Sequence, residues 1–165
     1  MTVGILVQRF GAHIRNSYSS YELDAQVHAQ AEIAAPEFPD DLRHVRECVA
    51  HHLILLVLLA RSDNDYDYRE RDVIVEHCIA VARGRGVELT DTHNTAFAEY
   101  AWSFRPSLLQ LDPAISALTH APHQEIGEFM NAARNVVAAD GANRPEELHF
   151  LSELNEDLKA LLSPA

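Results

Sequence analysis

Four carboxylates crowd into the short segment that follows the most apolar run of the chain. Asp63, Asp65, Asp67 and Glu70 come directly after the run from Leu53 to Ala60. Oxygen ligands of this kind suit calcium, magnesium and manganese, whereas zinc favours nitrogen and sulfur. The sequence therefore predicts a divalent-cation site in this segment, with calcium or magnesium/manganese favoured and zinc less favoured.

The electrostatic field of the preceding helix supports the same prediction. The run from Leu53 to Ala60 is too short to span a bilayer and fits a helix that is buried on every side, at the centre of an all-α core. The C-terminal end of a helix carries roughly half a negative charge, so each carboxylate just beyond it costs a few tenths of a kcal/mol. A bound cation would remove this cost.

A second acidic segment near the C-terminus repeats the first. Asp140 and Glu147 have the same spacing as Asp63 and Glu70, and the apolar positions around the two pairs align without gaps. We therefore predict an internal duplication of a helix, acidic loop and helix. Residues 63–70 are called the first acidic loop below, and residues 140–147 the second. The candidate ligands of the second loop are Asp140, Glu146 and Glu147.

A simpler interpretation of both loops is helix punctuation. In the first loop, Asp67 caps the next helix and Glu70 closes a capping box, while the other acids are solvated turn residues. In the second loop, Gly141 ends one helix and Pro145 begins the next, with acids at its positive end. An EF-hand is excluded, because the first loop holds no glycine and Ile74 stands where the closing glutamate belongs. The sequence alone leaves metal binding and capping open.

The histidines near these segments are weaker candidates. His149 lies close to the second loop and could add a nitrogen ligand, although a solvent-facing side chain is the favoured interpretation. His51 and His52 lie about three helical turns before Asp63, which is too far for a shared site. His77 lies on an apolar helical face, where a hydrogen-bonded core histidine is the ordinary case.

The overall charge excludes several classes of partner. The 165 residues include 25 acidic and 13 basic ones, which gives a formal net charge of -12. Such a chain repels nucleic acid and anionic lipid and attracts cations or a basic protein surface. The two cysteines, Cys48 and Cys78, both lie in helical pattern, which predicts reduced thiols in a cytoplasmic protein. The apolar opening from Val3 to Val7 is too short for a signal peptide.

The periodicity of apolar residues predicts helices, with no competing strand pattern. Residues 1–39 are predicted as an N-terminal extension with a helix over residues 21–35, and residues 40–165 as one helical domain. The helices of the domain are expected from the Asp40-Asp41 cap to about Arg61, from Asp67 to Gly84, from Thr90 or Asp91 to the break at Pro106, from Asp112-Pro113 through Leu118, from Pro122 to Asp140, and from Pro145 to about Leu162. The predicted fold class is an all-α, single-domain helical bundle of about seven helices with internal pseudo-duplication.

With both loops described, the chain resembles the tellurite-resistance TerB-like family. The signature of that family is an apolar helix that ends in an Ala-Asp-Gly loop, followed by a glutamate that opens the next helix. Residues 139–141 with Glu147 match it, and residues 61–64 with Glu70 form a diverged copy. The match covers roughly residues 42–162. Asn143 replaces the family's branched apolar residue, and Arg144 stands where the first loop has an aspartate, so the second loop is expected to be the weaker metal site.

The resemblance implies a TerB-like helical domain that binds divalent metal and acts in tellurite resistance or stress response through partners at the membrane. We therefore expect a non-catalytic interaction module that binds a divalent cation and docks protein partners with a basic surface, without nucleic acid and without membrane insertion. A metal-free helical adaptor that docks a basic partner is the first alternative. A metal-dependent hydrolase is the second, and it is disfavoured because the sequence holds no recognisable nucleophile arrangement, HExxH motif or phosphate-binding loop.

Overall fold

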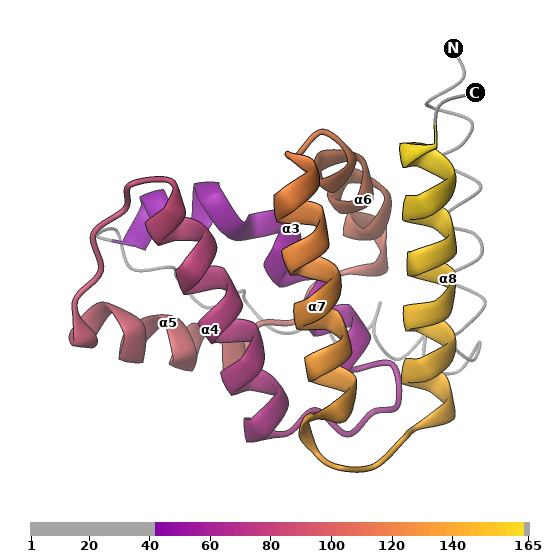
Figure 1. Cartoon of the computed structure of the whole chain (residues 1–165). Helices are drawn as coiled ribbons and strands as arrows, with labels where there is room; N and C mark the ends of the chain where they lie inside the picture. The colour runs from indigo at the N-terminus through magenta and orange to yellow at the C-terminus, as the bar shows by residue number, and fades with distance from the viewer. Residues whose placement is uncertain (1–41, 164–165) are drawn as a thin grey trace.

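The computed structural model describes residues 42–163, and every regular element in that part of the chain is a helix (Figure 1). The α-helices are α3 (Arg43–Ala60), α4 (Tyr68–Gly84), α5 (Asp91–Ser103), α6 (Leu111–Thr119), α7 (His123–Ala139) and α8 (Pro145–Leu162), and a 3-10 helix, η2 (Leu108–Gln110), precedes α6. The all-α prediction is therefore confirmed for these residues. The predicted extension 1–39, its helix over residues 21–35 and the Asp40-Asp41 cap lie outside the described residues, so the total of about seven helices stays a prediction.

Helix α3 forms the centre of the hydrophobic core. Its residues from Leu55 to Ala60 are all inaccessible to solvent, as expected of a helix buried on every side, whereas Ile54 in the same run is only partly buried. Helices α4, α6, α7 and α8 all pack against it. A helix surrounded in this way needs apolar side chains around its whole circumference, which explains why the run shows no amphipathic period.

The surrounding helices are amphipathic and bury one face each. Helix α4 contributes Ile74 and Cys78 to the core, and α7 contributes Phe129 and Ala133, at the spacing of one helical turn. Figure 1 shows α7 between α4 and α8, and it shows that the α3–α4 and α7–α8 connections lie at the same, lower end of the bundle. These connections contain the two acidic loops. The packing of the four helices therefore places the loops at one end of the molecule.

The helix boundaries agree with the predicted caps at most positions. The Asp67 side chain accepts hydrogen bonds from the first turn of α4 and forms a capping box with Glu70, as predicted. The exception is α6, which was predicted to begin at the Asp112-Pro113 pair. Ser107 and Gln110 form an earlier capping box around η2, so the chain is already helical when it reaches Asp112.

Two further observations concern the cysteines and the character of the helices. Cys48 and Cys78 are both free thiols, as predicted. Within residues 42–163, none of the helices combines the length and the apolar character that a bilayer span requires.

Candidate metal centre between the acidic loops

The two acidic loops have the same local conformation. Asn64 and Gly141 occupy equivalent positions, and both have positive φ values, 66° and 75°. Asparagine and glycine tolerate this left-handed region better than other residues do. Asp63 accepts a hydrogen bond from the backbone N–H of Asp65 at 2.9 Å, and Asp140 accepts the equivalent bond from Ala142 at 2.7 Å. The loops therefore agree with the predicted duplication in backbone geometry as well as in sequence.

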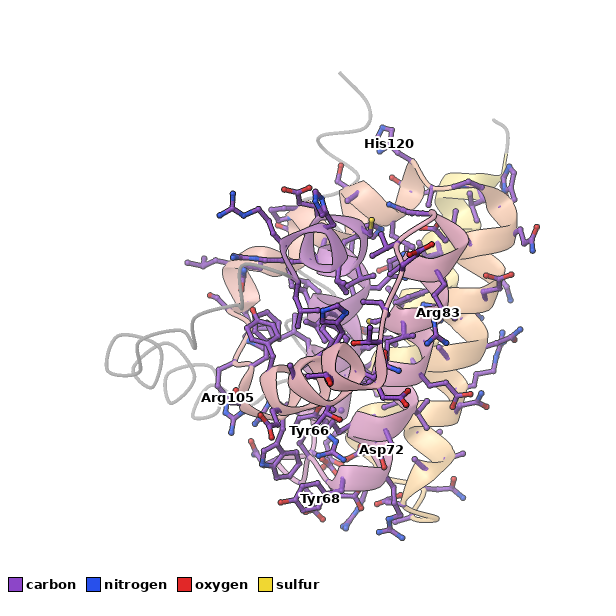
Figure 2. All side chains as sticks on the ribbon, turned by 90° about the vertical axis from the view of Figure 1, so that its left-hand side faces the viewer. Tyr66, Tyr68, Asp72, Arg83, Arg105 and His120 are labelled. Atoms are coloured by element: carbon purple, nitrogen blue, oxygen red, sulfur yellow. The ribbon has the colours of Figure 1, made fainter. Side chains whose placement is uncertain are left out.

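The first acidic loop is held against α5 by two aromatic side chains. The Tyr66 hydroxyl donates a hydrogen bond to the backbone carbonyl of Ala101 in α5, at 3.2 Å. The Arg61 guanidinium lies over the Tyr66 ring, and Tyr68 stacks on Trp102 with ring centroids 4.1 Å apart. Figure 2 shows Tyr66 and Tyr68 together at the lower end of the molecule. These contacts fix the loop against α5 and so restrict where its carboxylates can lie.

Glu70 and Glu147 form a buried carboxyl pair at the interface of the two loops. Each lies in the first turn of its helix, α4 or α8, and each is almost inaccessible to solvent, with exposed fractions of 2% and 1%. The two side chains are hydrogen-bonded to each other. The positive ends of α4 and α8 both favour negative charge here, which partly offsets the cost of burying two acids.

The pair cannot be fully ionised at neutral pH without a counter-charge. Burial raises the pKa of Glu70 to about 7 and that of Glu147 to about 9. The shared hydrogen bond and the negative charge of Glu70 raise the pKa of Glu147 further, and the same hydrogen bond lowers that of Glu70. The two carboxyls therefore share one proton, through which one of them donates a hydrogen bond to the other.

Asp63 and Asp140 lie beside this pair, at the C-terminal ends of α3 and α7. Their side chains are only 5% and 11% exposed. Burial raises the pKa of Asp63, and the charge of Asp140 raises it further. Both aspartates also raise the pKa of Glu147. Four carboxyl groups, one aspartate and one glutamate from each loop, thus interact electrostatically in one small region.

Arg144 contacts acids of both loops. Its Nε lies 3.4 Å from Asp63 Oδ2 and 3.9 Å from Asp140 Oδ2, and its Nη2 donates a hydrogen bond to Asp65 Oδ2 at 3.0 Å. The sequence predicted only that Arg144 deprives the second loop of a ligand. The structure shows that it bridges both loops, because the helices bring the second loop against the first.

The remaining predicted ligands do not join this group. Asp65 is exposed and pairs with Arg144, while Asp67 caps α4 and pairs with Arg69 at 2.7 Å. Glu146 is exposed in the first turn of α8. His149 is solvent-facing, as favoured, and lies 3.2 Å from Glu153. The seven predicted acids therefore divide into four central ones and three that cap, pair or face solvent.

The four carboxyls are the right kind of ligand for a hard divalent cation, but their oxygen atoms are not yet close enough together to bind one. Oxygen atoms of carboxyl groups are preferred ligands of calcium and magnesium. Glu147 Oε1 is buried without a hydrogen-bond partner, so it is available to bind an ion. Within residues 42–163, however, only His51, His52 and Glu125 form a triad of potential ligands whose donor atoms all lie within 4.8 Å of one another. Cation binding between the loops therefore requires the carboxylates to move closer and Arg144 to withdraw.

A substitution at Asp67 tests its capping role independently of the four central carboxyls. We expect Asp67→Ala to lower the free energy of unfolding by about 1 kcal/mol, because two backbone N–H groups of α4 lose their acceptor. Urea denaturation measures this loss. Asp72→Ala, at an exposed position of the same helix, is the control and should change stability by about 0.5 kcal/mol or less. Equal effects of the two changes would contradict the capping role.

Comparisons with known proteins leave the family resemblance untested. No protein-family model matches the chain, no curated protein matches its sequence, and no solved structure matches its fold. The function proposed below therefore depends on the geometry of the site.

Proposed function

We propose that the protein is a non-catalytic, divalent-cation-binding interaction module of the TerB-like, tellurite-resistance or stress-response type. The observation that carries this proposal is the buried pair Glu70 and Glu147, which the two loops contribute from equivalent positions. Burying two acids against each other costs stability, and the capping role of Glu70 does not require Glu147 to be buried beside it. A calcium, magnesium or manganese ion would offset that cost.

The residues that would hold the ion are Asp63, Glu70, Asp140 and Glu147. Both glutamates lie at helix N-termini, and both aspartates are oriented by a backbone N–H within their own loop. Oriented carboxylates of this kind lose less conformational entropy on binding than flexible ones. The proton that Glu70 and Glu147 share must leave before the ion enters, so cation affinity should rise with pH.

A cation titration tests the proposal. Calorimetry on the full chain, stripped with EDTA, should show binding of calcium, magnesium or manganese by the wild type and a large loss in Asp63→Asn. At a free ion concentration about a hundred times the dissociation constant, the bound ion should stabilise the fold by roughly 2.7 kcal/mol. Asp72→Asn is the matched control, since its carboxylate is 65% exposed and already paired with Arg71. Identical melting of wild type and Asp63→Asn with and without each ion would exclude the site.

A metal-free adaptor is the second candidate, and Arg144 is the observation that favours it. Its guanidinium already contacts acids of both loops, so the structure has an internal cation at this end of the bundle. In this case the remaining negative charge of the surface would dock a basic protein, and the loops would need no metal.

Changing Arg144 separates the two candidates by the direction of the effect. If a divalent cation binds between the loops, Arg144→Gln removes a competing charge, and we expect the affinity for calcium or manganese to rise about tenfold. If Arg144 is the only counter-charge that the loops use, the same change lowers stability and creates no cation response. Arg83→Gln is the control, because Arg83 is exposed in the last turn of α4, at the opposite end of that helix from the first acidic loop.

A further inference from the structure

A second cluster of ionisable side chains lies between helices α3, α4 and α7, away from the acidic loops. His51 and His52 come from α3, His77 from α4 and Glu125 from the first turn of α7. The two α3 histidines lie about three helical turns, roughly 16 Å, before the first acidic loop. This cluster therefore cannot share an ion with the loops.

We propose that His51, His52 and Glu125 form a separate site for a borderline transition metal such as zinc. Their donor atoms all lie within 4.8 Å of one another. Two imidazole nitrogens with one carboxylate oxygen suit zinc or cobalt and differ from the all-oxygen set of the loops. Three protein ligands leave a fourth position of a tetrahedral ion for water or for a ligand from a partner.

The observed distances are close to those that such an ion needs. Bonds of about 2.0–2.1 Å place tetrahedral ligands roughly 3.3 Å apart. His52 Nε2 lies 2.8 Å from Glu125 Oε1, and His51 Nε2 lies 3.9 Å from the same oxygen. Since no two of the three donor atoms are more than 4.8 Å apart, each distance has to change by about 1.5 Å or less to reach this value.

The nitrogen of His51 is free to bind. His51 Nε2 is buried and has no hydrogen-bond partner, although Glu125 lies just beyond hydrogen-bonding distance. Burial and then the charge of Arg85 lower the pKa of His51, so its imidazole is neutral at physiological pH. A neutral imidazole is the form that binds a metal. An unpaired, buried nitrogen costs stability, and a metal ion would satisfy it.

His52 already has the outer hydrogen-bond partner that metal-binding histidines use. It is fully buried, and its Nδ1 lies 3.0 Å from His77 Nε2. Since the Glu125 carboxylate only accepts, His52 Nε2 carries the proton without metal, and its Nδ1 accepts from His77. With metal on Nε2, the proton lies on Nδ1 and is donated to His77 Nε2. Each ring exchanges one neutral tautomer for the other, so neither needs to lose a proton.

Arg85 is the competitor for this site. Its Nη2 donates a hydrogen bond to Glu125 Oε1 at 2.6 Å, which is the same oxygen that contacts both histidines. Arg85 lies directly after α4, beside Gly86 with its positive φ of 83°, and its side chain is 38% exposed. An exposed guanidinium at a turn can move into solvent. Metal binding would therefore exchange one cation for another at Glu125.

Metal titration of the untagged full chain tests the proposal. After removal of metal with EDTA, zinc affinity is measured by competition with a chelator, and cobalt binding by its visible d–d absorption. His51→Asn should weaken zinc binding roughly a hundredfold and abolish the tetrahedral cobalt spectrum. His149→Asn is the matched control, because His149 is exposed and pairs with a glutamate at the surface. It should leave both signals unchanged.

Two further variants test the roles of His77, which orients a ligand, and of Arg85, which competes with the metal for Glu125. His77→Gln should weaken zinc binding about tenfold while the cobalt spectrum stays tetrahedral, because His77 orients a ligand without being one. Arg85→Gln should tighten zinc binding, since it removes the competing charge.

The result can distinguish this site from the acidic loops. His51→Asn should leave calcium or manganese binding intact, and Asp63→Asn should leave the cobalt spectrum intact. Equal zinc affinities of wild type and His51→Asn in correctly folded protein, or an equal loss in His149→Asn, would overturn the proposal. A zinc affinity that Arg85→Gln weakens would also count against it.

Discussion

Without metal, the wild-type protein should lose about 2–3 kcal/mol of its free energy of unfolding between pH 7 and pH 9. The cause is the carboxyl pair. The folded-state pKa of Glu147 is about 9 and that of Glu70 about 7, both above the ordinary value of 4.5. The folded protein therefore binds more protons than the unfolded chain in this range, and stability falls as the pH rises through the folded pKa values. Urea denaturation at a series of pH values in EDTA measures this decline.

The window from pH 7 to pH 9 isolates the carboxyl pair from other groups. Burial lowers the pKa values of His51, His52 and His77, which adds stability as the pH rises toward 6.5 and has no further effect above it. Burial raises the pKa of the Cys78 thiol, which opposes folding only above about pH 9. Between these limits, the two glutamates are the groups with resolved shifts that should change their proton occupancy.

Glu147→Gln should remove most of the decline. The amide keeps the size of the side chain and can still donate a hydrogen bond to Glu70, but it has no proton to lose. We expect the stability advantage of the variant over wild type to grow by about 2 kcal/mol between pH 7 and pH 9. Glu146→Gln is the control, since this exposed neighbour should follow the wild-type profile. Parallel pH profiles of wild type and Glu147→Gln would contradict the buried pair.

Replacing Phe129 by alanine should destabilise the fold by about 3–5 kcal/mol, the largest effect that we expect of a single change. Phe129 is fully buried in α7, and its ring packs edge-on against His52 at 5.6 Å and His77 at 6.2 Å between centroids. The cost combines the lost burial of the ring with the cavity that remains. Thermal and chemical denaturation measure it.

A smaller substitution at Phe129 and a control substitution at an exposed leucine test how well the ring fills the core. Phe129→Leu fills most of the volume and should cost about 1.5 kcal/mol or less. Leu109→Ala, at a position that is 79% exposed, should cost about 0.5 kcal/mol or less. Similar losses for Phe129→Ala and Leu109→Ala would show that the ring does not fill the core as described.

The helices and their ends followed from the sequence because they depend on neighbours a few residues away. The Asp67 and Glu70 capping box, the proline that opens α8 and the glycine that follows α7 were all predicted, and the structure confirms them. The start of α6 was wrong by about one residue, because the Ser107 capping box begins the turn before Asp112. The predicted caps and the start of α6 all depend on hydrogen bonds within one helical turn, so the residues involved are close together in the sequence and can be recognised there.

The acidic loops were recognised from the sequence, but their internal arrangement was not. Repetition of the aspartate and glutamate spacing indicated that Asp140 and Glu147 match Asp63 and Glu70. Nothing in that spacing separates these four from Asp65, Asp67 and Glu146, because all seven are acids near a helix end. Burial makes the distinction, and burial depends on which face of α4 and α8 meets the rest of the bundle.

The contacts that define both candidate sites were decided by the tertiary structure alone. The hydrogen bond from Arg144 to Asp65 spans 79 positions in the chain, and that between His52 and Glu125 spans 73. No local pattern relates residues so far apart, because helix packing sets their distance and local hydrogen bonding does not. The sequence by itself therefore determined the helices, their caps and the position of the acids. Only the packing of α4, α7 and α8 around α3 brought the carboxyls together, supplied Arg144 as their counter-charge, and placed Glu125 beside the two histidines of α3.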